Sequence, residues 1–173
     1  MRTLDEKNGF LKDDLYDSLR WLFVGAVAWY APERCPNQIV LGMYTSLVQA
    51  RALYEFYYGR RNGDNALAVD FAPSWRPVPT SLYSKYMAAG KPANKRVFHI
   101  VYNRSRHAGG RGHDGSDHIN KQVLKFAKDL HQLTEEFIKS AQPNFRLIVK
   151  SALDRALDEA NHAADGYGVA NPI

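Results

Sequence analysis

Apolar residues recur at every third or fourth position along most of the chain, which is the spacing of one face of an α-helix. This spacing predicts long helices over residues 10–31, 36–58, 118–139 and 144–161, and a short helix from Thr80 to Ala88. Prolines and glycine-rich turns separate these segments, because both disfavour a continuing helix. The predicted fold class is all-α, an up-down bundle of four to five helices.

The connections between these helices complete the predicted fold. A short turn with two prolines joins the first two long helices, so we expect an antiparallel hairpin. Residues 65–79 read as a packed irregular connection with one helical turn, and residues 162–173 as a frayed tail. The length of 173 residues suits one domain spanning residues 1–173, with its core at about 10–160.

The segment after the short helix is ambiguous in type. Residues 97–102 are rich in β-branched and aromatic side chains, which fit a strand as well as a helix. A lone strand among helices would have no partner, so residues 93–105 are predicted to be helical. Residues 107–117 contain four glycines and are predicted to form a loop.

The composition is that of an ordinary globular protein, 45% hydrophobic and 24% charged. A single cysteine, Cys35, excludes an intramolecular disulfide and favours a reducing compartment. The N-terminus lacks the apolar core of a secretory signal, and the longest apolar run, 21–30, is about half of a membrane span. We therefore expect a cytoplasmic protein that does not enter a membrane.

Positive charge is concentrated in one place. Between residues 91 and 111 there are six basic residues and no acidic one, namely Lys91, Lys95, Arg96, Arg104, Arg106 and Arg111. The whole chain carries +5, so this segment contributes +6 and the remainder sums to −1. Such local charge favours a phosphate or polyanion site, with a merely solvated polar surface as the alternative.

Of the two histidines within this basic segment, His99 lies at helical spacing from cationic and amide groups. A neutral imidazole at His99 could take a proton from a ribose hydroxyl. A cation one turn away could stabilise the charge that develops on the phosphate. The first candidate site therefore consists of Asn94, Arg96, His99 and Arg104 as catalytic residues, with Lys95 and Arg111 as phosphate-binding residues.

The run Asn94-Lys95-x-x-x-His99, followed by Arg104 and preceded by two long helices with the sequence RALYEF at 51–56, resembles the HEPN superfamily. The resemblance covers roughly residues 10–140 and is to the small toxin-related and abortive-infection-like members. It implies a helical bundle that forms a homodimer and cleaves RNA without metal or cofactor, in a toxin or defence context with a cognate antitoxin or toxin partner. It also implies that His99 is the catalytic histidine, while the signature arginine falls at Ala93.

Other interpretations of the sequence remain open. Arg106 and His113 match the same loose motif and form a second candidate site, on the glycine-rich loop. The histidines and aspartates of 107–118 could instead hold a metal in an all-α phosphohydrolase. Tyrosines 54, 57 and 58 could stack on bases, although their helical spacing is also that of core residues. Finally, the chain could be a non-catalytic interaction module, antitoxin-like or a dimerisation scaffold.

Overall fold

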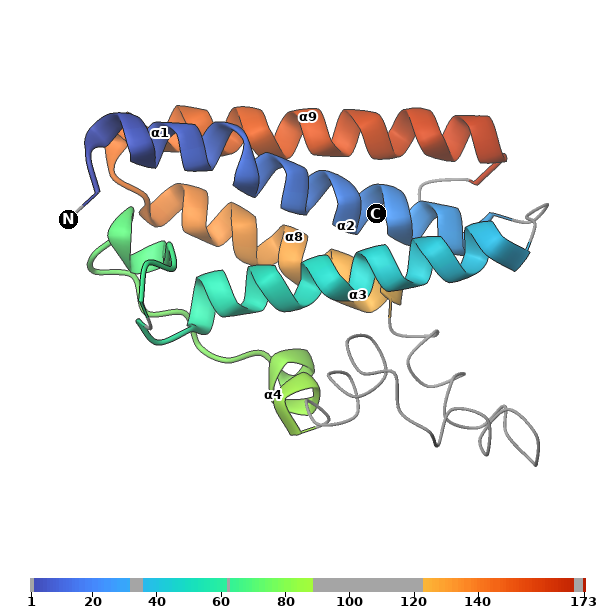
Figure 1. Cartoon of the computed structure of the whole chain (residues 1–173), viewed down its shortest axis with the longest axis horizontal. Helices are drawn as coiled ribbons and strands as arrows, with labels where there is room; N and C mark the ends of the chain where they lie inside the picture. Colours follow the sequence, from blue (N-terminus) through green and yellow to red (C-terminus); the bar gives the residue numbers. More distant parts are fainter. Residues whose placement is uncertain (1, 32–35, 62, 89–122, 170–172) are drawn as a thin grey trace.

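The computed structural model describes residues 2–31, 36–61, 63–88, 123–169 and 173 (Figure 1). Within these ranges the chain is helical and contains no strand. The helices are α1 (Leu4–Lys12), α2 (Asp14–Tyr30), α3 (Pro36–Tyr58), η1 (Ala68–Asp70), α4 (Ser81–Ala88), α8 (Val123–Ser140) and α9 (Pro143–Tyr167). The prediction of an all-α helical bundle is confirmed.

Four long helices form the bundle, as two hairpins side by side (Figure 1). Within each pair, α2 with α3 and α8 with α9, the two helices run antiparallel, because the turn between them is short. The directions of the four helices do not simply alternate up and down along the chain, as the prediction had them. Tyr54 bonds to Asp129 and Tyr57 to Thr134, so α3 and α8 run parallel. The long connection between them carries the chain back along the bundle.

The N-terminal helix differs from the prediction of a single helix over 10–31. Helix α1 begins at Leu4, where Thr3 and Glu6 form a capping box. This signal, a threonine followed three residues later by glutamate, was present in the sequence and was missed. Asp13 then breaks the helix between α1 and α2. In place of the single helix predicted over residues 10–31, the structure therefore has two helices, and the first of them begins earlier than predicted.

The other predicted boundaries can be compared directly. Helix α3 spans the predicted residues 36–58, and η1 supplies the one helical turn predicted between 65 and 79. Thr80 caps α4 as expected, since its Oγ1 accepts a hydrogen bond of 3.0 Å from the Tyr83 amide. Helix α9 continues to Tyr167, six residues beyond its predicted end, and Ala164 within that extension is buried.

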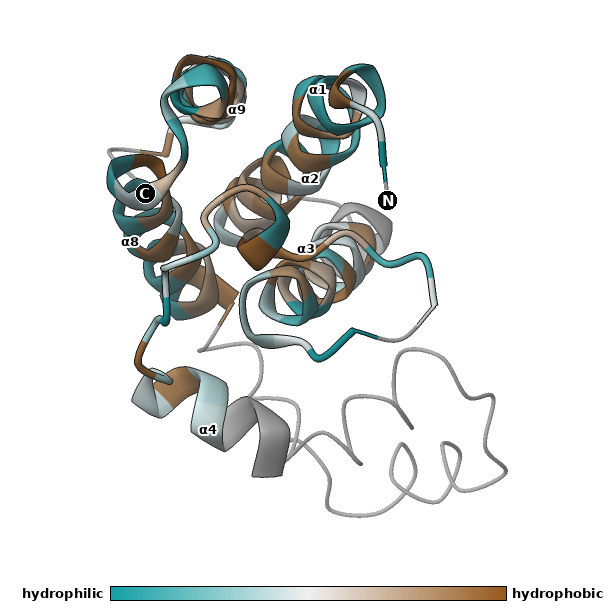
Figure 2. Ribbon diagram, turned by 90° about the vertical axis from the view of Figure 1, so that its left-hand side faces the viewer, coloured by the Kyte–Doolittle hydropathy of each residue, from teal (hydrophilic) through white to brown (hydrophobic). Residues whose placement is uncertain are grey.

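Aromatic side chains dominate one end of the core. The ring of Phe137 is fully buried and lies 5.5 Å from Phe56, 5.7 Å from Tyr57 and 5.3 Å from Trp75, measured between centroids. Figure 2 looks along the bundle and shows hydrophobic surfaces turned toward the shared interior, with hydrophilic residues outside on α8 and α9. This amphipathic arrangement is what joins the two hairpins.

Helices α2 and α3 approach closely where each has a glycine. A Cβ atom on Gly42 would lie 2.8 Å from the Gly25 carbonyl oxygen and 3.1 Å from Ala28 Cβ. Next to this crossing, the buried Ser46 hydroxyl donates a 2.8 Å hydrogen bond to the Leu22 carbonyl oxygen. Small residues therefore set the distance between the two helices of the first hairpin.

Candidate functional site

The predicted site residues all lie outside the described residues, within 89–122. This applies to both candidate sites, to the predicted helix and loop that carry them, and to the alternative metal ligands. The residues concerned are Asn94, Lys95, Arg96, His99, Arg104, Arg106, Arg111 and His113. What the structure describes is the part of the bundle from which this segment departs and to which it returns.

Both ends of the basic segment are attached to the same flank of the bundle. Helix α4 ends at Ala88 and α8 begins at Val123, so the residues between these two helices, 89–122, include the whole basic segment. Helix α4 packs against α8, and Figure 1 shows α4 below the bundle on the side of α3 and α8. The candidate functional region is therefore the flank formed by α3, α4 and α8.

A hydrogen-bond node at Asp129 ties these three helices together. The Tyr54 hydroxyl of α3 donates to Asp129 Oδ2 over 2.6 Å. The Thr80 hydroxyl, at the N-terminus of α4, donates to the same oxygen over 2.9 Å. The sequence pattern alone did not predict this node. Its signal was an acidic residue of α8 at helical spacing from the apolar Phe126 and Leu133.

The tyrosines proposed as a base-stacking surface are part of the packed core. Tyr54 and Tyr57 are buried, and the Tyr57 hydroxyl shares a 2.7 Å hydrogen bond with the Thr134 hydroxyl. The ring of Tyr58 is stacked on Tyr83, with centroids 4.2 Å apart. The stacking interpretation is therefore wrong for Tyr54 and Tyr57, which are buried, while Tyr58 is half-buried with one face on Tyr83.

Burial changes the acidity of this cluster. Burial, assisted by the hydrogen bond to Asp129, raises the pKa of Tyr54 above its ordinary value. Burial likewise raises the pKa of Tyr57, and it raises the pKa of Tyr58 to about 12. At neutral pH these phenols are protonated hydrogen-bond donors. Their role is to hold the flank together, and they do not supply a proton acceptor for catalysis.

The raised pKa values of Tyr54 and Tyr57 predict a loss of stability at alkaline pH. Above about pH 10 the tyrosines ionise in the unfolded chain while Tyr54 and Tyr57 stay protonated in the folded one, so the folded state binds more protons. Each should lower the free energy of unfolding by about 1.4 kcal/mol per pH unit. Urea unfolding between pH 8 and 11 measures this slope. If Tyr54→Phe has the wild-type slope, the explanation is incorrect.

Two of the hollows on the described surface bear on function. The larger, about 410 Å³, lies beside the Asp129 node between α8 and the connection that leads to α4. Its wall combines Trp75 and Val78 with Arg76 and the carboxylates of Asp129 and Glu136. The two carboxylates outnumber the one guanidinium, so this hollow does not favour a nucleic-acid backbone.

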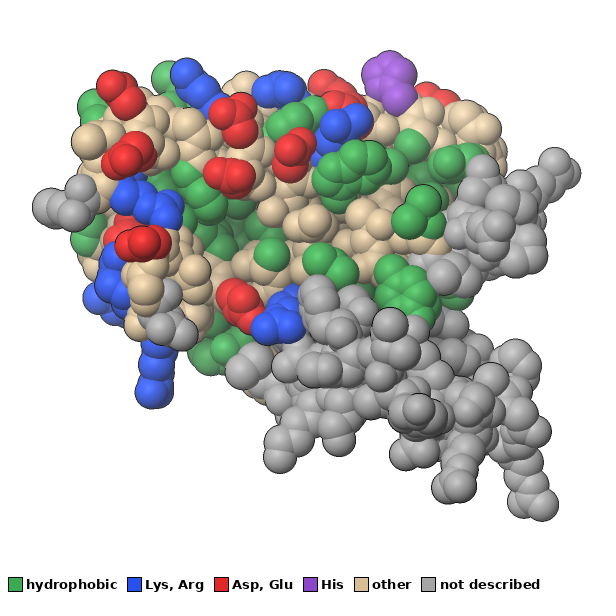
Figure 3. Space-filling model, viewed as in Figure 1, with side chains coloured by type: hydrophobic (Ala, Val, Ile, Leu, Met, Phe, Trp, Pro, Cys, Tyr) green, Lys and Arg blue, Asp and Glu red, His purple; other side chains and the backbone are tan. Residues whose placement is uncertain are grey.

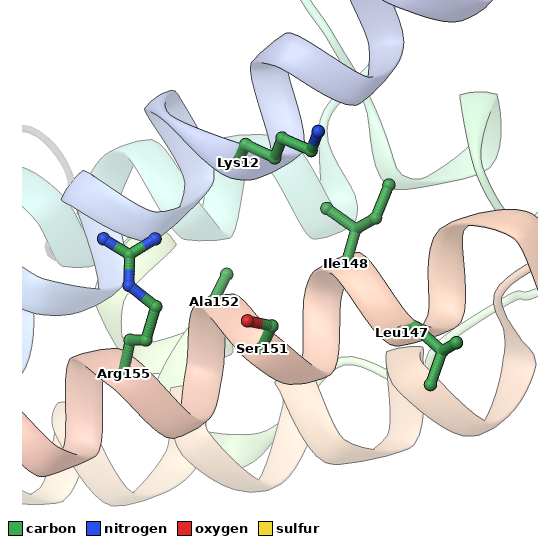
Figure 4. A pocket seen from close by; sticks show the side chains of 6 residues that line it. All are labelled: Lys12, Leu147, Ile148, Ser151, Ala152 and Arg155. Atoms are coloured by element: carbon green, nitrogen blue, oxygen red, sulfur yellow. The ribbon is translucent and has the colours of Figure 1, made fainter.

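The smaller hollow, about 230 Å³, lies between the end of α1 and helix α9 (Figure 4). Lys12 and Arg155 approach it from the two helices, and Ser151 lies on its floor. The Arg155 guanidinium stacks over the Tyr16 ring, 3.9 Å from its centroid. Its charge would suit a small anion, but neither cation is buried and no further feature defines a ligand there.

The described residues give no sign of metal or membrane chemistry. Among them, no three His, Cys, Asp or Glu side chains come together in a way that could hold a metal ion. No helix in the described ranges has the length and apolarity needed to cross a bilayer.

Comparison of the chain with family models, with curated proteins and with solved structures finds no match. The function must therefore be argued from the charge distribution, the helical architecture and the chemistry of the residues themselves.

Proposed function

We propose that this protein binds RNA and acts as a HEPN-like, metal-independent endoribonuclease. The observation that carries the proposal is the run of six basic and no acidic residues at 91–111. A backbone phosphate is the ligand that such a run attracts most strongly. The helical bundle supports the proposal as well, because it is the architecture that the resemblance implies.

The proposed chemistry requires a base, a cation and an orienting group close together. His99 removes the proton from the ribose 2′-hydroxyl, whose oxygen then bonds to the adjacent phosphorus, and Arg104 or Arg96 stabilises the charge on the phosphorane. The bond from phosphorus to the 5′ oxygen breaks, and this leaving oxygen takes a proton from water or from the protonated His99. Asn94 orients the phosphate or the histidine, while Lys95 and Arg111 hold neighbouring phosphates. In line with the resemblance, we propose that the protein works as a homodimer in a toxin or defence context, together with a cognate partner.

The test is cleavage of single-stranded RNA by the full chain in EDTA. His99→Ala should lower the cleavage rate by at least about 100-fold, the usual contribution of a general base. His162→Ala is the matched control, because this exposed histidine lies on α9 and bonds the Asp158 carbonyl of its own helix. Cleavage that survives His99→Ala would exclude this residue and direct attention to Arg106 and His113.

A non-catalytic interaction module is the second candidate, favoured by Ala93 at the position of the signature arginine. It predicts RNA binding or partner binding without cleavage. Binding to single-stranded RNA should weaken with salt, with a log–log slope of up to about −4 for six phosphate contacts. A metal that copurifies with the protein and restores activity after EDTA treatment would instead support the phosphohydrolase alternative.

A further inference from the structure

The larger hollow, beside the Asp129 node, has the size and the mixed lining of a small-molecule site. Its volume of about 410 Å³ lies within the range that such sites occupy. One wall is a single face of α8, on which the lining residues follow one another at helical spacing, namely Asp129, Gln132, Leu133 and Glu136. The other wall is the connection that leads to α4, residues 75–80. A ligand in the hollow would therefore contact one helix and one irregular segment.

The acidic groups of the hollow suit a ligand with positive charge. Oδ2 of Asp129 accepts hydrogen bonds from Tyr54 and Thr80, whereas Oδ1 accepts none from the described residues. Glu136 accepts a long hydrogen bond of 3.5 Å from the Gln132 amide. In the part of the chain that the structure describes, neither carboxylate forms an ion pair with a basic side chain. Both can therefore accept hydrogen bonds from a cationic ligand.

The one basic residue of the hollow does not neutralise these carboxylates. Arg76 Nη1 donates hydrogen bonds of 2.8 Å to the backbone carbonyls of Pro73 and Trp75, so the guanidinium is held on its own segment. Two carboxylates and one guanidinium leave a net charge of −1. Elsewhere acidic and basic side chains are intermixed, as along the top of the bundle in Figure 3, and Lys150 Nζ lies 2.7 Å from Asp154 Oδ2.

The apolar lining and the spacing of the carboxylates define the shape of the ligand. Val78 is 83% exposed and Trp75 is half-buried. A methylene chain on these side chains would remove apolar surface from water, and an indole ring attracts cations. Asp129 and Glu136 are seven residues apart, which places their backbones about 10.5 Å apart along the helix. The ligand should carry two positive charges separated by about this distance on a flexible apolar chain.

We propose that this hollow binds a linear aliphatic polyamine. Its terminal ammonium groups donate hydrogen bonds to Asp129 and Glu136, and an inner amine donates to the carbonyl oxygen of the Gln132 amide. The methylene chain lies on Trp75 and Val78. An extended triamine with spacers of three and four carbons, such as spermidine, has end nitrogens at about the required separation. This site uses none of the residues assigned to RNA cleavage, so it does not rest on the proposed function.

Isothermal titration calorimetry of the full chain with spermidine, at low salt and without RNA, tests the proposal. The whole chain carries +5, so it should repel a polyamine in general, and binding reports a local acidic site. We expect a dissociation constant below about 1 mM. Absence of binding up to about 10 mM spermidine would overturn the proposal.

Glu136→Gln removes one of the two charges and leaves the Asp129 node intact, so it should raise the dissociation constant at least about threefold. Together with Asp129→Asn, whose amide oxygen can still accept from both hydroxyls, the increase should be at least about tenfold. Glu135→Gln is the matched control, since it makes the same change at the next residue of α8, whose side chain is 55% exposed and does not line the hollow.

This control should bind spermidine with the affinity of the wild-type chain, and circular dichroism verifies that each variant is folded. Equal weakening by Glu135→Gln and Glu136→Gln would mean that spermidine responds only to the general charge of α8, and the site would be wrong. Unchanged affinity in Glu136→Gln would overturn the proposal as well.

Discussion

Replacing Phe137 by alanine is expected to lower the free energy of unfolding by about 3–5 kcal/mol, the usual range for a phenylalanine removed from a core. The side chain is completely buried, and the rings of Phe56, Tyr57 and Trp75 surround it. These rings come from α3 and from the connection before α4, so they cannot all close on the space that the phenyl group leaves. The residual cavity should therefore keep the loss near the upper part of this range.

Urea unfolding followed by circular dichroism measures this loss. Leu147→Ala is the control, because it removes an apolar side chain that is 76% exposed and should change stability by less than about 0.5 kcal/mol. A loss below about 1.5 kcal/mol for Phe137→Ala would mean that the aromatic end of the core is not packed as described. An equal loss for the control would point to an effect other than burial.

The helices were predictable because periodic burial leaves a direct record in the sequence. Helix α3 begins at Pro36 and ends at Tyr58, as its apolar stripe and flanking turn residues indicated. The direction of α8 was not predictable in the same way. A short turn forces the next helix to return antiparallel, whereas the long connection after α3 allows either direction. Only the pairing of Tyr54 with Asp129 and Tyr57 with Thr134 determines it.

The candidate site, like the fold, was predictable only in part. The sequence shows the charge of residues 91–111 and the proton-accepting chemistry that His99 could supply, since residue types and spacing are sufficient for both. It does not show contacts between distant elements. The Asp129 node joins the aspartate to two side chains, Tyr54 and Thr80, which lie 75 and 49 residues away in the sequence, so no local pattern predicts it. The burial of Tyr54 and Tyr57 of α3 also depends on tertiary packing, and the local sequence did not show it.

The close approach of α2 and α3 predicts that one substitution will have opposite effects at two glycines. Alanine is the better helix former by about 1 kcal/mol, so Gly9→Ala in α1 should stabilise the protein by about 0.5–1 kcal/mol, since nothing lies within 4 Å of the new Cβ. At Gly42 the new Cβ would lie 2.8 Å from the Gly25 carbonyl oxygen and 3.2 Å from the Trp29 amide nitrogen. These are backbone atoms, which cannot turn aside as a side chain can.

Gly42→Ala should therefore force the two helices apart, at an overpacking cost of about 1–3 kcal/mol or more that outweighs the gain in helix propensity. We expect a net loss of about 1–2 kcal/mol, so that the two variants differ by about 1.5–3 kcal/mol in urea unfolding. Gly9→Ala is a stringent control, because the chemical change is identical and only the surroundings differ. If Gly42→Ala were as stable as Gly9→Ala, the first hairpin could not be packed through its glycines.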